Sequence, residues 1–212
     1  MKHLIIVAAG GMGRTVYSMA RECVGYGDTF DVKGFLNDDI HSLDKFENYP
    51  PIIGTIKGYK PEEDDVFVCS LGNTYAKKNI CETLKHRGAK FVTLIHEKAV
   101  IRSNAQIGDG CIVAEYATIG SDAVVGNNCL IQAYACVAHD CRLGDYVRVD
   151  THCTCVGGVV IENGATIHTS AVLSHGVVVE EDAVVGACSF VIKRVKAGTT
   201  VVGNPARRLS SK

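Results

Sequence analysis

The feature that most constrains this chain is a strict six-residue repeat from Ile101 to Lys196. Sixteen hexads follow one another without an insertion or deletion, and fifteen of their first residues are isoleucine, valine or leucine. A fixed short period is typical of a solenoid, in which each repeat packs only against its neighbours. The sequence therefore predicts a β-solenoid whose core holds these first residues: Ile101, Ile107, Val113, Ile119, Val125, Ile131, Val137, Leu143, Val149, Cys155, Ile161, Ile167, Leu173, Val179, Val185 and Val191.

The fifth residue of each hexad forms a second column, made of alanine, cysteine, valine and one serine, Ser189. Four of the ten cysteines stand in this column, where small side chains suit a core. The Cys153-x-Cys155 spacing does not match a zinc knuckle, and no second pair follows it. We therefore expect reduced structural thiols rather than disulfides or a metal cluster.

Hexads with aliphatic first residues fit a triangular prism, with three short strands and eighteen residues in each coil. The repeat region then makes about five coils. Because parallel strands stack about 4.8 Å apart, residues eighteen positions apart should become vertical neighbours. This relation predicts which distant residues meet on the surface of the prism.

The part of the chain before the hexads alternates strand patterns with helix patterns. Strand patterns cover 4–8, 32–36, 66–70 and 91–95, helix patterns cover 14–24 and 74–87, and 48–61 is expected to be mostly irregular. This alternation predicts a small Rossmann-like parallel sheet with helices packed on it. We therefore expect an α/β domain at 1–96 and a solenoid with a C-terminal cap at 97–212. No Ser/Gly linker separates the two, so we expect a rigid connection.

Composition excludes several classes of function. Twenty-two basic and twenty-three acidic side chains give a formal net charge of −1, which offers no basic footprint for nucleic acid. The longest apolar runs are too short for a membrane span, and the apolar start of the chain is better explained as a first strand than as a signal peptide. We therefore expect a cytoplasmic protein.

Several motifs together resemble one branch of the hexapeptide-repeat acyltransferases, the sugar acetyltransferases of sialic acid, bacillosamine and perosamine pathways. The resemblance covers essentially the whole chain and implies a left-handed parallel β-helix. It also implies acetyl-CoA as co-substrate, no metal, and an oligomer, expected to be a trimer, that places CoA along the prism between subunits. The matching segments are the hexads themselves, 8–14, 34–38, Ile95-His96, 138–141 and 202–207.

His139 is the first candidate for chemistry, because it stands outside both core columns and Asp140 follows it. An imidazole titrates near neutral pH, and a carboxylate can fix its tautomer, so the pair suits a general base. The alternative is a surface histidine at a turn with no catalytic role. The resemblance implies that His139 takes the proton from an attacking sugar amine or hydroxyl and that Asp140 orients it.

The eighteen-residue relation places Gly157 and then His175 on the same vertical track as His139. A glycine beside the base leaves room for a thioester, and its backbone N–H could stabilise an oxyanion. The resemblance implies this oxyanion role for Gly157, although Gly157 could equally be a corner that needs an unusual backbone conformation. We keep His175 as a candidate for cofactor binding, and we expect His152 and His168, which lie off the track, to be solvated or structural.

Arg148 departs from the resembled family, which often has a second histidine at this position, nine residues after the base. Three explanations stay open: an electrostatic donor, a contact to a negatively charged part of the substrate, or a solvated side chain on the coil.

The loop Gly10-Gly11-Met12-Gly13 follows the first predicted strand and opens a helix, so its backbone N–H groups could hold phosphate. It is a degenerate dinucleotide fingerprint, because Ala8 replaces the first glycine. The alternative is a close-packed strand-to-helix turn. The resemblance implies that this loop holds the nucleotide or diphosphate of a nucleotide-linked sugar and that Asn37 and Asp38 reach the base or ribose.

The end of the chain is locally basic, with Lys193, Arg194, Lys196, Arg207 and Arg208, which would suit the phosphates of CoA or a solvated end. The segment Gly203-Asn204-Pro205-Ala206 resembles the adenine-side loop of the family.

We therefore expect an acetyl-CoA-dependent N-acetyltransferase that acts on a nucleotide-linked (UDP or GDP) 4-amino-deoxy sugar. O-acetylation of sialic acid or another sugar is the first alternative, and a non-catalytic nucleotide-sugar-binding protein is the second. A zinc site like that of the γ-class carbonic anhydrases is disfavoured, because that enzyme needs no nucleotide-type domain.

Overall fold

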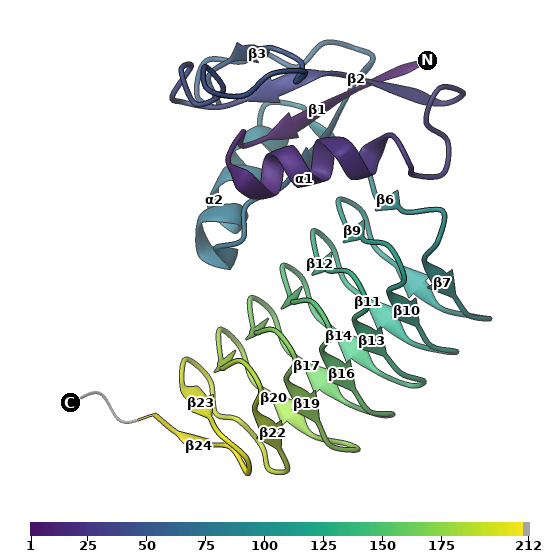
Figure 1. Cartoon of the computed structure of the whole chain (residues 1–212), viewed down its shortest axis with the longest axis vertical. Helices are drawn as coiled ribbons and strands as arrows, with labels where there is room; N and C mark the ends of the chain where they lie inside the picture. Colours follow the sequence, from purple (N-terminus) through teal and green to yellow (C-terminus); the bar gives the residue numbers. More distant parts are fainter. Residues whose placement is uncertain (210–212) are drawn as a thin grey trace. The chain divides into compact units, whose positions relative to one another are not determined.

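A computed structural model describes residues 1–209 of the chain (Figure 1). The chain divides into two compact units, Met1–Glu97 and Lys98–Lys212. The last three residues of the expected C-terminal cap, 210–212, lie outside the described residues.

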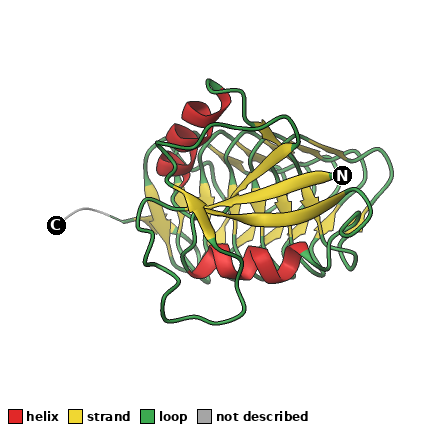
Figure 2. Cartoon of the chain, turned by 90° about the horizontal axis from the view of Figure 1, so that it is seen from above, coloured by secondary structure: helices red, strands yellow, loops and turns green. Residues whose placement is uncertain are grey.

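The first unit is a parallel five-stranded sheet in the order β3-β2-β1-β4-β5. Figure 2 shows its strands in yellow, running side by side, with the two helices in red. Residues 4–7 of β1 and 66–69 of β4 are buried and apolar, as expected for a parallel sheet covered on both faces. The elements are β1 (Lys2–Val7), α1 (Gly11–Ala20), β2 (Phe30–Leu36), β3 (Ile52–Gly54), β4 (Asp65–Cys69), α2 (Thr74–Lys85), β5 (Lys90–Phe91) and β6 (Leu94–Ile95).

The predicted elements are present, but some of their boundaries were wrong. Helix α1 ends at Ala20 rather than near Val24, and turns follow it. The segment expected to be irregular contains the short edge strand β3. The last predicted strand is split into β5 and β6, because the chain leaves the sheet after Phe91. Edge strands carry weak patterns, since only part of each one is buried.

The second unit is a parallel β-helix, so the predicted solenoid is confirmed. Sixteen two-residue strands, β7 to β22, form three faces with one strand of each face per coil. The first face holds β7, β10, β13, β16, β19 and β22, the second face holds β8, β11, β14, β17 and β20, and the third face holds β9, β12, β15, β18 and β21, followed by β23 (Thr200–Val202) and β24 (Arg207–Arg208).

Figure 1 shows the coils stacked on one another from β7 onward. The sixteen strands are β7 (Val100–Ile101), β8 (Gln106–Ile107), β9 (Ile112–Val113), β10 (Thr118–Ile119), β11 (Val124–Val125), β12 (Leu130–Ile131), β13 (Cys136–Val137), β14 (Arg142–Leu143), β15 (Arg148–Val149), β16 (Thr154–Cys155), β17 (Val160–Ile161), β18 (Thr166–Ile167), β19 (Val172–Leu173), β20 (Val178–Val179), β21 (Val184–Val185) and β22 (Phe190–Val191).

Strand pairing follows the predicted eighteen-residue register throughout. Thr118 pairs with Cys136, and Cys136 pairs in turn with Thr154. From Val113 onward every first residue of a hexad is buried, whereas Ile101 in the first coil is 37% exposed. A terminal coil has a neighbouring coil on one side only, so its inward residues are covered less well.

The cysteines are free thiols, and eight of the ten are buried. Burial raises the pKa of the Cys153 thiol to about 11 and raises that of Cys155 well above its usual value. Both groups are therefore protonated at neutral pH, as expected for small core side chains.

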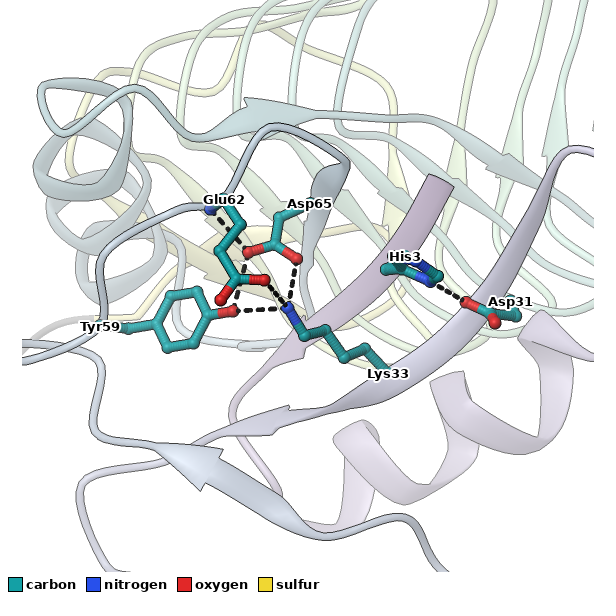
Figure 3. Close-up of polar contacts among 6 residues, drawn as sticks. All are labelled: His3, Asp31, Lys33, Tyr59, Glu62 and Asp65. Atoms are coloured by element: carbon teal, nitrogen blue, oxygen red, sulfur yellow. Dashed lines mark hydrogen bonds and ion pairs between the residues drawn. The ribbon is translucent and has the colours of Figure 1, made fainter. Parts of the chain in front are cut away.

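In the first unit, the buried carboxylate of Asp65 on β4 binds a side chain of β2 (Figure 3). Asp65 on β4 receives hydrogen bonds from Lys33 Nζ on β2 at 2.8 Å, from Tyr59 Oη at 2.7 Å and from the Glu62 backbone N–H at 2.8 Å. Burial raises the Asp65 pKa, but these hydrogen bonds together lower it below its usual value. Burial also lowers the Lys33 pKa, and its bonds to Asp65, Glu62 and Tyr59 outweigh that effect and raise it.

We predict that Asp65→Asn lowers the free energy of unfolding of the first unit by about 2–3 kcal/mol, because Lys33 loses its buried partner. A group with a lowered pKa stabilises the fold fully above its unfolded value and loses that contribution as pH falls through the folded value. The difference between wild type and variant should therefore shrink below about pH 4. Urea unfolding followed at pH 7 and pH 3 measures it.

The control is Asp31→Asn, which removes the exposed partner of His3 that Figure 3 shows on the neighbouring part of β2. Both side chains of that pair are about two-fifths exposed, at 42% and 41%, so its loss should change stability little. Equal effects of the two substitutions would contradict the assignment of Asp65 as the stabilising group.

Candidate active site

His139 and Asp140 form the turn that carries the chain from β13 on the first face to β14 on the second. Asp140 has a φ of 59°, a left-handed conformation that aspartate tolerates at tight turns. Its Oδ2 lies 2.7 Å from Nδ1 of His139, and both side chains are about two-thirds exposed, at 64% and 66%. Because an ionised carboxylate can only accept, Nδ1 carries the hydrogen when the ring is neutral, and Nε2 then has a free lone pair. The ring is therefore a fixed acceptor pointing away from the core.

Gly157 lies one coil further along, directly against the His139 ring. A Cβ atom added to Gly157 would stand 2.5 Å from both Cε1 and Nε2 of His139. No real side chain tolerates such contacts, so only glycine permits this ring position. Within residues 1–209 the backbone N–H of Gly157 makes no hydrogen bond. The imidazole and an unpaired backbone donor thus lie side by side.

The third member of the track, His175, occupies the next coil. The N–H of Gly158 donates to the His139 carbonyl at 3.0 Å, and the N–H of Gly176 donates to the Gly157 carbonyl at 3.2 Å. The exposed His175 ring lies near Gly158, with Cε1 3.6 Å from a Cβ added there. The structure therefore brings His139, Gly157 and His175 onto one edge of the prism.

Arg148 lies elsewhere, on β15 of the third face. Its guanidinium donates to both carboxylate oxygens of Asp150, from Nε at 2.6 Å and from Nη2 at 2.9 Å. Asp150 also accepts from Gln132 Nε2 and faces His168 Nδ1 at 3.0 Å. His168 therefore has a structural contact, which is one of the two expectations stated for it. Gln132, Asp150 and His168 are eighteen residues apart and lie on one vertical track, but spacing alone does not show the contact with Arg148.

His152, the other histidine off the track, stacks on Tyr134 with ring centroids 4.9 Å apart. Tyr134 stacks in the same way on Tyr116. These rings form an exposed ladder on the corner between the third and first faces.

In the first unit, Gly10 is the N-cap residue of helix α1 and has an extended backbone. Gly13 cannot be replaced, because an added Cβ would lie 2.1 Å from the Ala8 carbonyl oxygen. Close packing of strand and helix therefore explains Gly13. The helix N-terminus formed by Gly11 and Met12 still presents backbone N–H groups that have no intrahelical acceptor.

Asn37 and Asp38 lie at the carboxyl end of β2 and hold the neighbouring loops. Asn37 Oδ1 accepts from the Ala9 backbone N–H at 3.1 Å, and its Nδ2 donates to the Asp39 carbonyl at 2.8 Å. Asp38 Oδ1 accepts from the Ile56 backbone N–H at 3.0 Å. Both side chains therefore shape the edge of the sheet beside the glycine loop.

The basic end of the second unit contains a cavity of about 400 Å³. Lys193, Lys196, Arg207 and Arg208 line it, together with Arg194, which pairs with Glu180 at 2.9 Å. Gly203 and Pro205 form the adjoining turn and do not line the cavity. The residues with cationic side chains that the sequence suggested for phosphate binding are therefore gathered at one place.

Within residues 1–209, no group of three or more histidine, cysteine, aspartate or glutamate side chains could hold a metal ion. No helix in the same range is long and apolar enough to cross a membrane.

Family models match both units. Residues 3–84 match the PglD N-terminal domain, and residues 122–157 match the bacterial transferase hexapeptide (six repeats) family. The UDP-N-acetylbacillosamine N-acetyltransferase of Bacillus subtilis (strain 168) is 29% identical over 117 residues, which cover 53% of this chain. The match spans about half, 51%, of that relative's length.

Two solved structures match nearly the full length of this chain. The acetyltransferase domain of PglB from Neisseria gonorrhoeae FA1090, in complex with acetyl coenzyme A, has a TM-score of 0.88 at 28% identity. The alignment covers 98% of this chain and 99% of that one. PerB from Caulobacter crescentus, in complex with CoA and GDP-perosamine, gives a TM-score of 0.88 with 99% and 98% coverage. Because the two sequences are 23% identical, this similarity shows the fold alone.

The resemblance found in the sequence is thus confirmed: the chain combines a PglD-type N-terminal domain with a bacterial transferase hexapeptide repeat and has the fold of the sugar acetyltransferases.

Proposed function

We propose that this protein is an acetyl-CoA-dependent N-acetyltransferase whose acceptor is a 4-amino-deoxy sugar linked to UDP or GDP. The observation that carries the proposal is the His139 ring, held by Asp140 and seated against Gly157. The similarity to an N-acetyltransferase of a UDP-linked amino sugar and to a domain solved with acetyl coenzyme A supports the choice of substrates.

The reaction needs one base and one oxyanion donor. The amine lone pair attacks the thioester carbonyl carbon, and His139 Nε2 accepts the proton that the nitrogen loses. The negative charge that forms on the carbonyl oxygen receives a hydrogen bond from the Gly157 N–H, which has no acceptor within residues 1–209. The carbon–sulfur bond then breaks, and CoA leaves as a thiolate that takes up a proton. No acyl-enzyme forms in this scheme.

Other predicted residues have proposed roles in holding the two substrates. We assign the cationic cavity at Lys193 and Arg207 to the phosphates of acetyl-CoA, with Gly203 and Pro205 as the adjoining loop and His175 further along the track. Opposite charge and the cavity volume support this assignment.

The N–H groups at Gly10, Gly11, Met12 and Gly13 would receive the diphosphate of the nucleotide sugar at the positive end of helix α1. Asn37 and Asp38 lie at the same edge of the sheet and would face the nucleoside.

As part of the same proposal, the protein works in the cytoplasm as a homo-oligomer, expected to be a trimer, which light scattering would detect.

We predict that His139→Ala lowers kcat by about 10²–10⁴-fold, because the base is lost. Acetyl-CoA binding, measured by calorimetry, should stay nearly unchanged, since the removed ring is exposed and within residues 1–209 hydrogen-bonds no side chain other than Asp140. The matched control is His152→Ala, which removes another exposed histidine and should leave kcat unchanged. A fully active His139→Ala protein would refute the role of His139.

We predict that Gly157→Ala lowers kcat by about 10²-fold or more, because the new methyl group displaces the His139 ring and crowds the oxyanion position. Val156→Ala, which creates the same alanine side chain at the exposed preceding residue by removing two methyl groups, should change kcat little. The thermal unfolding midpoint separates a local effect from misfolding. An active and stable Gly157→Ala protein would contradict the proposed geometry.

A CoA-release assay against a panel of acceptors tests the reaction itself. We expect turnover with one of the UDP- or GDP-linked 4-amino sugars and none with buffer. Turnover only with free sialic acids would assign O-acetylation, in which the same base acts on a hydroxyl. Binding of nucleotide sugar without CoA release from any acceptor would indicate a non-catalytic binding protein.

A further inference from the structure

Helix α2 buries a lysine and a cysteine on one face. Lys77 is 2% exposed and Cys81 is fully buried, and because they lie four residues apart they are neighbours on the helix surface. Leu84 continues the same buried stripe. Cys69, the last residue of β4, is also fully buried. A lysine in this stripe serves no step of the proposed acetyl transfer.

The Lys77 ammonium has no hydrogen-bonding partner in the part of the chain that the structure describes. A buried ammonium without a counter-ion is strongly destabilising, so a fold that keeps one needs a negative charge close to it. Among residues 1–209 no carboxylate pairs with Lys77 Nζ. Its charge acts instead on the thiols of Cys69 and Cys81. A thiolate is therefore the anion that this site can supply.

The two thiols are joined by a hydrogen bond between their sulfur atoms. The S–H of Cys81 donates to the Cys69 sulfur, and this bond lowers the pKa of Cys69 and raises the pKa of Cys81. Burial raises both pKa values, the positive charge of Lys77 lowers both, and the Leu71 backbone N–H adds a hydrogen bond to the Cys69 sulfur. Cys69 is therefore the thiol that ionises, and Cys81 is the thiol that keeps its proton.

A thiolate beside a cation and a second thiol is the arrangement of a redox-active dithiol. The thiolate is the form of cysteine that reacts with oxidants, and a neighbouring thiol can then close a disulfide. Cys153 and Cys155 in the second unit are buried as well, but burial raises the pKa of both, so they stay protonated. They serve as an internal reference for buried thiols that should not react.

We propose that Cys69 and Cys81 are a redox-active dithiol, assisted by Lys77, that hydrogen peroxide converts into a disulfide. The Cys69 thiolate attacks one peroxide oxygen and the O–O bond breaks, so that the sulfur is oxidised to a sulfenic acid and the hydroxide that leaves takes up a proton. The Cys81 sulfur then attacks the Cys69 sulfur, the S–O bond breaks, and water leaves with the Cys81 proton. Two thiols and one peroxide thus give one disulfide and two water molecules.

The new bond would fasten α2 to the end of β4, in the interior of the first unit. The next residue, Ser70, is 1% exposed, and its hydroxyl donates to the carbonyl oxygens of Val7 and Ala8, at 2.8 and 3.1 Å. The dithiol therefore lies beside the turn that leads from β1 into α1. Because full burial excludes bulky reagents, the oxidant that suits the site is a small uncharged one that enters through local opening of the fold.

Peptide mapping after peroxide treatment tests the proposal. Native protein is exposed to hydrogen peroxide, quenched with catalase, alkylated in denaturant and digested without reduction. Mass spectrometry should find the Cys69 and Cys81 peptides joined with the loss of two hydrogen atoms, while Cys153 and Cys155 are recovered alkylated. Dithiothreitol should restore both thiols of the pair.

Variants test the role of each member. Cys81→Ser should stop the reaction at the Cys69 sulfenic acid, which dimedone traps. Lys77→Met should slow disulfide formation about 10-fold or more, because methionine fills the buried space without supplying a charge. Lys78→Met, at the exposed neighbouring residue, is the matched control and should leave the rate unchanged. Circular dichroism shows whether each variant is folded, and if Lys77→Met is not, the peptide map of the wild-type protein still decides the question.

Recovery of Cys69 and Cys81 as free thiols while the exposed Cys188 is oxidised would overturn this inference. Oxidation of Cys153 and Cys155 as fast as the pair would also overturn it, since that result would report unfolding. An unchanged rate in folded Lys77→Met would refute the role of the lysine. None of these measurements requires acetyl transfer, so their outcome is independent of the proposed function.

Discussion

The hydrogen-bonded stacking of successive coils is the constraint on which the second unit depends. Each coil holds eighteen residues, so the backbone of one rung satisfies that of the next without a shift of register from Val100 to Val191. Aliphatic first residues and small fifth residues then fill a core that is uniform along its length. Because the register does not shift, surface side chains eighteen residues apart are aligned as strictly as the side chains of the core.

That alignment explains how exposed side chains acquire fixed orientations without a deep pocket. His139 is held by the carboxylate that follows it and by the bare Cα of Gly157 one coil away. On the third face, Asp150 receives Gln132 from the coil before and His168 from the coil after. In both places one ring nitrogen faces a carboxylate oxygen, and this contact orients the imidazole.

The first unit is subject to a different constraint, because the helices of a parallel sheet must pack close to the ends of the strands. Gly13 allows α1 to approach the Ala8 carbonyl, and Asn37 holds the preceding backbone at Ala9. Lys33 on β2 and Asp65 at the start of β4 join the two strands that flank β1 through a partly buried ion pair. The geometry of the sheet therefore depends on packing and polar contacts that no single strand contains.

The sequence alone determined the architecture of the β-helix, its eighteen-residue coil and the meeting of His139 with Gly157, because a fixed period converts spacing directly into contact. It predicted the parallel sheet of the first unit but not the edge strand β3 or the end of α1, whose patterns are short and half exposed. Only the tertiary structure showed that Arg148 is engaged by Asp150 and that His168 shares that carboxylate. The physical reason is that rotamers and hydrogen-bond partners on an outward face depend on neighbouring coils on either side, whereas inward positions are dictated by the need to fill the core.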